Sequence, residues 1–423
     1  MTSNTKQSQS SRIIRPVAAA VIILSCVWLM KGAASFGLSK ILSRYSLVAN
    51  SVAAANEAVK LTPNDAEAHR ARAVVLNNSG LKGDAAKEME VAVSLRPRDD
   101  LLWMEVGILR DGNGDADSAL VAFDHSVRLA PRYGHPHWQR GNLLVRLGRY
   151  DEGFSDLRLA AASNRDFLPG LIDLAWGVSR EDGRLTEDLV QFQDDQARLA
   201  LSRFFAHRRK NQEALQQFRS ITTPISEDAR ADLVRTLIQS KAFLEAFEIW
   251  KSGSVNLNSA SIIQDGGFEQ DLILDQSGFG WQAPKYDNLI FALDVNDPHS
   301  GGRSLRITFD GYDNSAAVLA QLVLVKPDRR YRVSFAVKTK DLVTGGLPTL
   351  KVVDASSEKV LSASQNFQGA TSDWTTMTVD FTTLPSSTAV FLRLERNACS
   401  SSPCPVFGHV WLDSFAVDEL SVN

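Results

Sequence analysis

The sequence predicts a chain that is helical first and β-structured later: an N-terminal transmembrane helix, an α-solenoid of helix-turn-helix repeats and a C-terminal antiparallel β-sandwich. Three observations lead to this fold class. Residues 16–30 form an apolar run without a charged residue, a proline recurs every 34 residues from Pro63, and beyond Trp250 apolar residues alternate with polar ones. These are the signatures of a membrane span, of stacked helix pairs and of half-buried strands, respectively.

The N-terminal segment is basic and apolar. Every acidic residue lies at Glu57 or beyond, whereas lysines and arginines flank the apolar run on both sides. We expect residues 1–12 to be disordered and residues 13–35 to span a membrane, because a span needs about 20 apolar residues. A cleaved signal peptide is the alternative, since small residues follow the run at 32–34. The balanced basic residues decide orientation only weakly.

The cysteines indicate which cellular compartment holds the part of the chain after the apolar run. Cys399 and Cys404 bracket the sequence Ser-Ser-Ser-Pro, a loop that a disulfide would close in an oxidising environment. Two neighbouring thiols can also arise by coincidence. The net charge of −3 gives no reason to expect a nucleic-acid partner.

Helical repeats are predicted for residues 45–255. Pro63, Pro97 and Pro131 each follow an amphipathic helical pattern at intervals of 34 residues. Each proline ends the second helix of a hairpin, and only neighbouring hairpins can cover its apolar face. We expect the residues before Ser51 to supply the second helix of an incomplete leading repeat. Two looser hairpins follow, at residues 196–221 and 228–250.

These residues resemble the tetratricopeptide repeat family. Small residues such as Gly107 and Ala119 fall where helices must approach closely, and large ones such as Phe123 fill the gaps between them. The resemblance implies a protein-binding scaffold whose first helices line a groove. The candidate partner-binding residues are Arg70, Asn77, Met104, Trp138, Asn142 and Arg146, accompanied by Glu67, Val74 and Ile108.

The β-domain is predicted for residues 256–423. Seven segments alternate or run apolar between Pro, Gly, Asp and Ser clusters: 304–309, 316–325, 330–339, 349–353, 375–381, 389–396 and 409–420. In the third segment, Tyr331, Val333, Phe335 and Val337 share one face. Strands without intervening helices favour an antiparallel β-sandwich.

The blocks DGGFEQ at 265–270, SGGRSLRI at 300–307, YRVSFAVKT at 331–339 and VWLDSFAV at 410–417 resemble the jelly-roll carbohydrate-binding modules of the galactose-binding-like class. The resemblance implies a structural calcium ion held by Glu269, Asp413 and the 300–303 loop, with Gly301 and Arg303 as the loop residues. Glu269 as a simple cap or ion-pair partner is the alternative. Aromatic faces would recognise sugar, and the candidates are Trp281, Tyr286, Tyr312 and Trp374, with Phe407 also considered.

Catalytic signatures are missing. The sequence has no G-x-S-x-G, H-E-x-x-H, P-loop or C-x-x-C motif. DGNGDAD at 111–117 imitates a calcium loop, but Ala116 and Ala122 replace two required residues, so we predict a turn between helices. GHPHW at 134–138 offers two histidines without a third ligand.

The sequence therefore predicts a non-catalytic envelope scaffold. We expect it to be anchored once in a bacterial inner membrane with its body in the periplasm or outside. Its repeats would bind a protein and its sandwich a glycan, in the assembly or export of an exopolysaccharide. A pure protein-interaction scaffold whose sandwich has lost sugar binding is the alternative, and an enzyme of unknown type is a third.

Overall fold

The structure is a computed structural model that describes residues 6–192, 194–253, 262–272, 274, 278–314 and 316–421, with side chains from Ala18 onward. The chain divides into two compact units, Met1–Gln191 and Phe192–Asn423. The last helices of the predicted solenoid thus belong to the same unit as the β-sheets. The predicted boundary between residues 255 and 256 lies outside the described residues.

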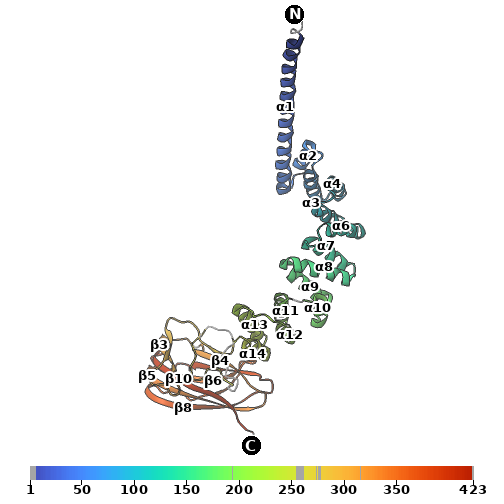
Figure 1. Cartoon of the computed structure of the whole chain (residues 1–423). Helices are drawn as coiled ribbons and strands as arrows, with labels where there is room; N and C mark the ends of the chain where they lie inside the picture. Colours follow the sequence, from blue (N-terminus) through green and yellow to red (C-terminus); the bar gives the residue numbers. More distant parts are fainter. Residues whose placement is uncertain are drawn as a thin grey trace. The chain divides into compact units, whose positions relative to one another are not determined.

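The first unit contains only helices, which follow one another along the chain (Figure 1): α1 (Lys6–Ala49), α2 (Val52–Leu61), α3 (Ala66–Asn78), α4 (Lys82–Leu95), α5 (Asp100–Gly112), α6 (Ala116–Leu129), α7 (Gly134–Arg146), α8 (Tyr150–Ser163), the 3-10 turn η1 (Arg165–Phe167), α9 (Leu168–Val178) and α10 (Gly183–Val190).

Helix α1 is longer than the predicted span. It begins at Lys6, inside the stretch expected to be disordered, and continues to Ala49. Its segment Ala18–Ala49 is long and apolar enough to cross a membrane, a property that signal sequences share. The end of α1 packs on α2, so residues before Ser51 supply the first helix of the leading repeat and α2 supplies the second. The prediction had these two roles reversed, because the proline that ends the hairpin lies at Pro63, after α2.

The repeat period sets where helices end. Helices α2, α4 and α6 stop at Leu61, Leu95 and Leu129, each two residues before a proline of the 34-residue series. The next helix starts from an aspartate cap where one is present, as at Asp65, whose carboxylate accepts the Glu67 amide at 3.2 Å. Local signals therefore define these hairpins.

One side chain at the same place in each repeat bonds the preceding proline carbonyl. The ring nitrogens of His69, Trp103 and His137 lie 2.9, 2.9 and 3.0 Å from the carbonyl oxygens six residues earlier. These contacts tie the start of each hairpin to the turn before it. His137 also contacts Asp156 at 2.8 Å, so the GHPHW histidine serves the fold. The DGNGDAD segment forms the turn between α5 and α6, as predicted, with Gly114 at φ +83°.

Close helix approach depends on small residues, as predicted. A Cβ atom on Gly107 would lie 2.5 Å from the ring of Phe123, and one on Gly141 would lie 2.8 Å from Leu157. Both large side chains are buried. Because no neighbour can move away cheaply, these glycines set the spacing within the α5–α6 and α7–α8 hairpins.

The second unit begins with four helices: α11 (Asp195–His207), α12 (Asn211–Arg219), α13 (Glu227–Gln239) and α14 (Phe243–Lys251). Helix α14 packs on the β-domain through aromatic contacts. The Phe279 ring lies 5.0 Å from Phe247 and 5.7 Å from Trp250, centroid to centroid. Lys241 Nζ donates to the Ser356 carbonyl at 2.5 Å. These contacts explain why the last hairpin groups with the sheets.

The β-domain is an antiparallel sandwich of two sheets (Figure 1), with strand orders β1-β4-β9-β6-β7 and β2-β3-β10-β5-β8. The strands are β1 (Trp281–Gln282), β2 (Leu289–Asp294), β3 (Ser304–Tyr312), β4 (Leu319–Leu324), β5 (Arg330–Val343), β6 (Pro348–Asp354), β7 (Val360–Ala363), β8 (Ala370–Thr382), β9 (Ala389–Arg396) and β10 (Val406–Glu419).

The sandwich core follows the alternation read from the sequence. On β5, Tyr331, Val333, Phe335 and Val337 are all buried, between 0 and 4% exposed, and face the other sheet. Phe335 stacks on Phe415 of β10, with centroids 5.1 Å apart. Strand β10 lies at the centre of its sheet, paired with β3 on one side and β5 on the other. Both partners therefore position the side chains of this strand.

Candidate functional site

The DGGFEQ segment is a tight turn that opens the sandwich. The Asp265 carboxylate accepts the Glu269 amide at 2.8 Å and caps the turn. Burial raises the pKa of Asp265, while the backbone donors oppose the shift. Phe268 adopts a positive φ of 54° and is fully buried, stacked on Trp281 with centroids 5.2 Å apart. Gly266 is required, since a Cβ there would lie 2.1 Å from the Phe415 carbonyl.

Glu269 reaches the loop before β3. Its Oε1 accepts the amides of Gly302 and Arg303 at 2.8 and 3.2 Å. The Arg303 guanidinium donates to the Glu269 carbonyl. Gly301 has φ +66°, and a Cβ there would lie 2.1 Å from Glu269 Oε1, so a side chain would displace the carboxylate. The predicted residues Glu269, Gly301 and Arg303 therefore meet at one place.

Asp413 reaches the same loop from β10. Its carboxylate is fully buried, and Oδ2 accepts the amides of His299 and Ser300 at 2.9 and 3.0 Å. A Cβ on Gly267 would lie 3.7 Å from Glu269 Cγ and 3.9 Å from Asp413 Oδ1, so the two acids flank Gly267. Within the described part of the chain neither acid forms an ion pair.

Two carboxylates, those of Glu269 and Asp413, flank Gly267, and carboxylate oxygens are a ligand type that Ca²⁺ takes. The loop meets them with N–H donors, which cannot bind a metal, and no group of three or more His, Cys, Asp or Glu among the described residues could hold one. Further ligands would have to be carbonyl oxygens or water.

The structure corrects two of the predicted glycan contacts. Trp281 is 5% exposed, and its indole donates to the Asp265 carbonyl at 3.0 Å. Tyr312 is 1% exposed, and its hydroxyl donates to the Ala316 carbonyl at 3.0 Å. Both rings belong to the core, because each polar atom bonds the domain's own backbone. Neither can present a ring face to sugar.

Tyr286 lies on the surface, 37% exposed, beside the edge strand β2. It lines an open groove of about 710 Å³ together with Lys285, Asp287 and residues 289–293. Its hydroxyl accepts a hydrogen bond from Asn314 Nδ2 at 2.9 Å. A polar aromatic at the rim of an apolar groove suits a sugar edge, but this groove holds one aromatic of the four predicted.

Trp374 and Trp411 share the outer face of the second sheet. Both indoles are partly exposed. Lys338 Nζ lies 5.6 Å from the Trp411 ring centroid and pairs with Asp297 at 2.7 Å. The Asp297 carbonyl accepts the Trp374 indole N–H at 3.0 Å. A lysine and an aspartate thus bridge two indoles on one face. Sequence reasoning missed Trp411 as a surface aromatic, although its alternation within β10 with the buried residues Val410 and Leu412 was a signal for an outward position.

The polar surround of Trp411 is fixed by hydrogen bonds. Its indole N–H donates to Asp294 Oδ2 at 2.9 Å. Burial raises the pKa of Asp294, but the bonds from Trp411 and Asn296 outweigh it and leave the pKa below its ordinary range. Arg306 lies 3.5 Å from the same carboxylate, and its buried Nε has no hydrogen-bond partner. Charged groups therefore frame an aromatic platform.

On the helical repeats, the predicted partner-binding arginines are paired within the chain. Arg70 of α3 bonds Glu105 of α5, with Nε–Oε distances of 2.9 and 2.7 Å. This bond and the nearby acids raise the pKa of Arg70. Arg146 of α7 pairs with Asp111 of α5 at 2.5 Å. Both pairs join neighbouring repeats, and each acid lies 35 residues from its arginine in the sequence.

The remaining predicted groove residues are partly buried, except for the exposed Ile108. Trp138 stacks on Phe167 with centroids 4.9 Å apart, and the Asn142 amide donates to the Trp138 carbonyl at 2.7 Å. Met104 packs on a core cluster, and Asn77 is partly exposed. Ile108 is 41% exposed on α5. The predicted groove residues thus offer apolar and amide contacts, while the two arginines are paired within the chain.

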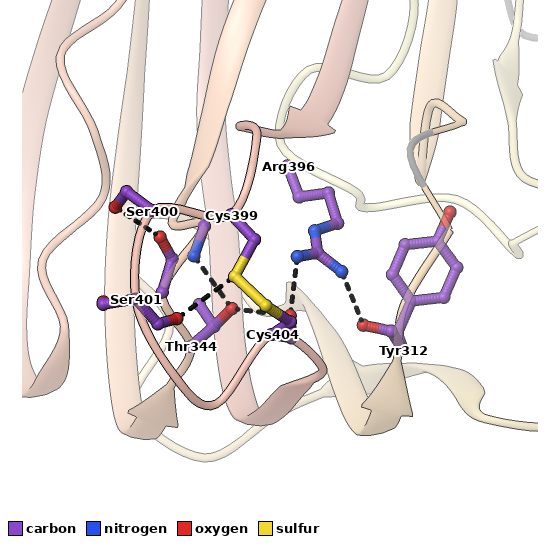
Figure 2. Close-up of a disulfide and its surroundings, with 9 residues drawn as sticks. Tyr312, Thr344, Arg396, Cys399, Ser400, Ser401 and Cys404 are labelled. Carbon is purple, nitrogen blue, oxygen red and sulfur yellow. Dashed lines mark hydrogen bonds between the residues drawn. A yellow bond between two sulfur atoms is a disulfide. The ribbon is translucent and has the colours of Figure 1, made fainter.

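Figure 2 shows the disulfide that joins Cys399 and Cys404 in the loop between β9 and β10. Arg396 Nη2 and the Thr344 hydroxyl both donate to the Cys404 carbonyl, at 2.6 and 3.2 Å. The Ser400 amide donates to the Gly345 carbonyl at 3.0 Å. The closed loop is therefore bonded to the β5–β6 connection. Cys26, by contrast, is a free, exposed thiol of α1.

The comparisons with known proteins concern the β-domain and the helical repeats separately. Residues 260–401 match the model of a family described as a carbohydrate binding domain. The β-domain is of the carbohydrate-binding-module kind. This match bears out the resemblance of the β-domain, and the helix pairs of the first unit have the architecture that the other resemblance implies.

A curated relative is Protein FlbA of Caulobacter vibrioides, 28% identical over 101 residues, which make up 24% of this chain and 17% of that protein. The chain thus spans about a sixth of that relative, and the relative's activity does not transfer with the match.

Solved structures similar to this chain include MamA and YrrB. MamA is 15% identical with a TM-score of 0.27 and covers 40% of this chain and 84% of its own. YrrB, titled a TPR protein with an unusual peptide-binding site, is 18% identical with a TM-score of 0.27 and covers 48% and 91%. MamA from Desulfovibrio magneticus RS-1 is 16% identical with a TM-score of 0.33 and covers 38% and 92%.

Proposed function

We propose that this chain is a non-catalytic envelope scaffold, anchored in the bacterial inner membrane by α1, whose repeats bind a protein partner and whose sandwich binds a glycan. The cellular setting we infer is the assembly or export of a cell-surface polysaccharide. The carbohydrate-binding match over residues 260–401 supports the glycan half, and the stacked helix pairs support the protein half. The Cys399–Cys404 disulfide supports a body in the periplasm or outside the cell.

The observation that carries the glycan half is the pair of partly exposed indoles, Trp374 and Trp411, bridged by Lys338 and Asp297. Sugar rings stack on indole faces, and the charged groups beside them can bond the hydroxyls. Lys338 now lies over the Trp411 ring. A sugar at this place would displace its ammonium toward solvent, where Asp297 is already 72% exposed.

The test is a glycan array with the full-length protein in detergent, with calcium and with chelator. We expect Trp411→Ala and Trp374→Ala each to weaken binding about tenfold or more, corresponding to about 1.4 kcal/mol. Phe391→Ala is the matched control, since Phe391 is a partly exposed aromatic on the other sheet, beneath Arg393. Loss of binding only in Tyr286→Ala would move the site to the groove beside β2.

A scaffold without sugar binding is the second candidate, and the burial of Trp281 and Tyr312 favours it. Binding to no glycan in the presence of calcium would support this candidate. Release of sugar from polysaccharide by the purified protein would contradict the non-catalytic proposal. A reporter fused after Asn423 tests the location, because activity characteristic of the cytoplasm would rule out an exported body.

The protein half can be tested at Ile108 in the groove. A photo-crosslinking residue at Ile108 should capture a partner in cells, whereas the same residue at Val121 on α6, 55% exposed, should not. Equal capture at both positions would contradict groove binding.

The structural calcium ion implied by the family also belongs to the proposal. Glu269 and Asp413 would hold it with the 300–303 loop, and it would supply the counter-charge that the two acids lack within the described residues. Direct titration of the chelated protein with Ca²⁺ by calorimetry tests this, and the absence of heat would contradict it.

A further inference from the structure

The last part of α1 has two unlike faces. One face packs on α2 and α3: Ser39, Ser43 and Ser46 are buried, and Ser39 Oγ donates to the Ala58 carbonyl at 3.0 Å. The other face carries large apolar side chains that are open to solvent: Leu38, Ile41, Tyr45 and Val48, which are 49, 65, 57 and 89% exposed. At about 100° per residue the two faces lie about 150° apart. The repeats therefore cannot cover the second face.

Lipid cannot cover all of this face either. Helix α1 is 44 residues long, or about 66 Å, whereas the hydrocarbon core of a bilayer is about 30 Å thick. The apolar run ends at Met30, before Lys31, and Lys40 and Arg44 follow. With residues 13–35 in the bilayer, as in the proposed function, residues 38–48 lie beyond it, where a stripe of large apolar side chains in water indicates an interaction surface.

The spacing of the stripe is that of a coiled coil. Leu38, Ile41, Tyr45 and Val48 are separated by three, four and three residues. The same alternation continues backwards through Ala34, Lys31, Val27 and Leu24 into the apolar run. A repeat averaging 3.5 residues over several turns is the pattern of a seam between two helices.

We propose that this seam, Leu24 to Val48, binds a second copy of the same helix and makes the chain a parallel homodimer. All copies cross the membrane in the same direction, so their seams start at the same depth and run side by side. Each seam residue then meets its own counterpart around a two-fold axis along the membrane normal. This proposal rests on the membrane anchor of the proposed function and does not depend on the glycan site.

Charges do not oppose this pairing outside the bilayer. Lys40 is turned toward the repeat and pairs with Asp65 at 3.1 Å. Arg44 flanks the seam and would face Ala49 of the other helix in a parallel heptad register. Lys31 is the one charged seam residue in the described helix, at the end of the apolar run, where its side chain can extend to the lipid headgroups. A polar residue at such a position favours one register over others.

Cysteine crosslinking of the full chain in membranes tests the proposal. In a Cys26→Ser background, single cysteines at Ile41, Tyr45 and Val48 should give a disulfide-linked species of twice the 46.4 kDa chain on mild oxidation. Phe36→Cys is the matched control, 51% exposed but about 150° from the seam. We expect at least a fivefold excess of dimer at the seam positions.

Equal dimer at Phe36 and the seam, no dimer at any position, or a crosslinked product of another mass would each overturn the proposal. A second measurement guards against a misfolded variant. Ile41→Glu with Val48→Glu changes two side chains that are exposed in the single chain, so the repeats should keep their helical circular dichroism. The mass in detergent should fall from dimer to monomer, and an unchanged mass would contradict the proposal.

Discussion

Replacing Asp413 tests the geometry of the candidate ion site most directly. Asp413→Asn removes a charge from a fully buried side chain that accepts the His299, Ser300 and Ser414 amides at 2.9, 3.0 and 2.5 Å. The asparagine amide keeps one acceptor oxygen, so it can accept either from the His299 and Ser300 amides or from the Ser414 amide. Its NH₂ group would face the donors on the other side.

The expected cost follows from these bonds. A bond to a charged group contributes about 1.5–3 kcal/mol against about 0.5–1.5 kcal/mol for a neutral one. His299 and Ser300 are exposed, so water can reach the freed amides and limits the loss. We expect about 3 kcal/mol of destabilisation, which lowers the Tm of a unit of this size by roughly 6–12 °C.

The assay is thermal unfolding in chelator, with Asp418→Asn as the matched control on the same strand. Asp418 is exposed, and its change should move the Tm by about 1 °C or less. An Asp413→Asn protein as stable as the parent in chelator would refute the hydrogen-bond reasoning. Adding Ca²⁺ separates the ion from the bonds: at about a hundredfold excess over Kd the ion adds about 2.7 kcal/mol to the parent, and the variant should lose most of this gain.

Three further outcomes are expected. Gly107→Ala should destabilise the first unit by about 1–3 kcal/mol in denaturant unfolding, because the new methyl carbon would lie 2.5 Å from a buried phenyl ring, whereas Gly112→Ala, with open space, should not. Cys399→Ser with Cys404→Ser should cost about 2 kcal/mol in the same assay, the chain entropy of a short loop, and an unchanged midpoint would contradict this. Hydrogen bonds from Thr223 and Thr222 lower the pKa of the Asp195 carboxyl to about 2. The stability that depends on this carboxylate should therefore be lost as the pH falls from 3.8 toward 2. Asp195→Asn should flatten that part of the curve of stability against pH.

Much of the helical architecture could be predicted because its signals are local. A proline two residues beyond each second helix and a glycine opposite Phe123 operate within one hairpin. The partners of Arg70 and Arg146 could not be predicted in the same way, since each lies one repeat away and depends on how two hairpins stack. The repeat register indicated which face they occupy, and the structure adds what neutralises them.

The candidate site in the sandwich could likewise be predicted only in part. Phe268 is fully buried, and Glu269 and Asp413, which were expected together, flank Gly267. The roles of the tryptophans could not be read from the sequence, because a large aromatic suits both a core and a ligand face. Trp281 stacks on Phe268 and lies in the core, whereas Trp411 occupies an outward-facing position in the alternation of β10. Strand β2 was missed, since LIFALD lacks a polar alternation.

The central place of β10 also constrains the order in which the two units assemble. Helix pairs of the first unit can form as soon as each hairpin of about 34 residues is available, because their contacts are local. The second sheet cannot, since β10, the last strand in chain order, fills the position between β3 and β5. Until β10 arrives, those two strands present open edges that invite wrong pairing. An exported sandwich would therefore need its whole length across the membrane before it could fold, while the repeats behind the anchor would already be complete.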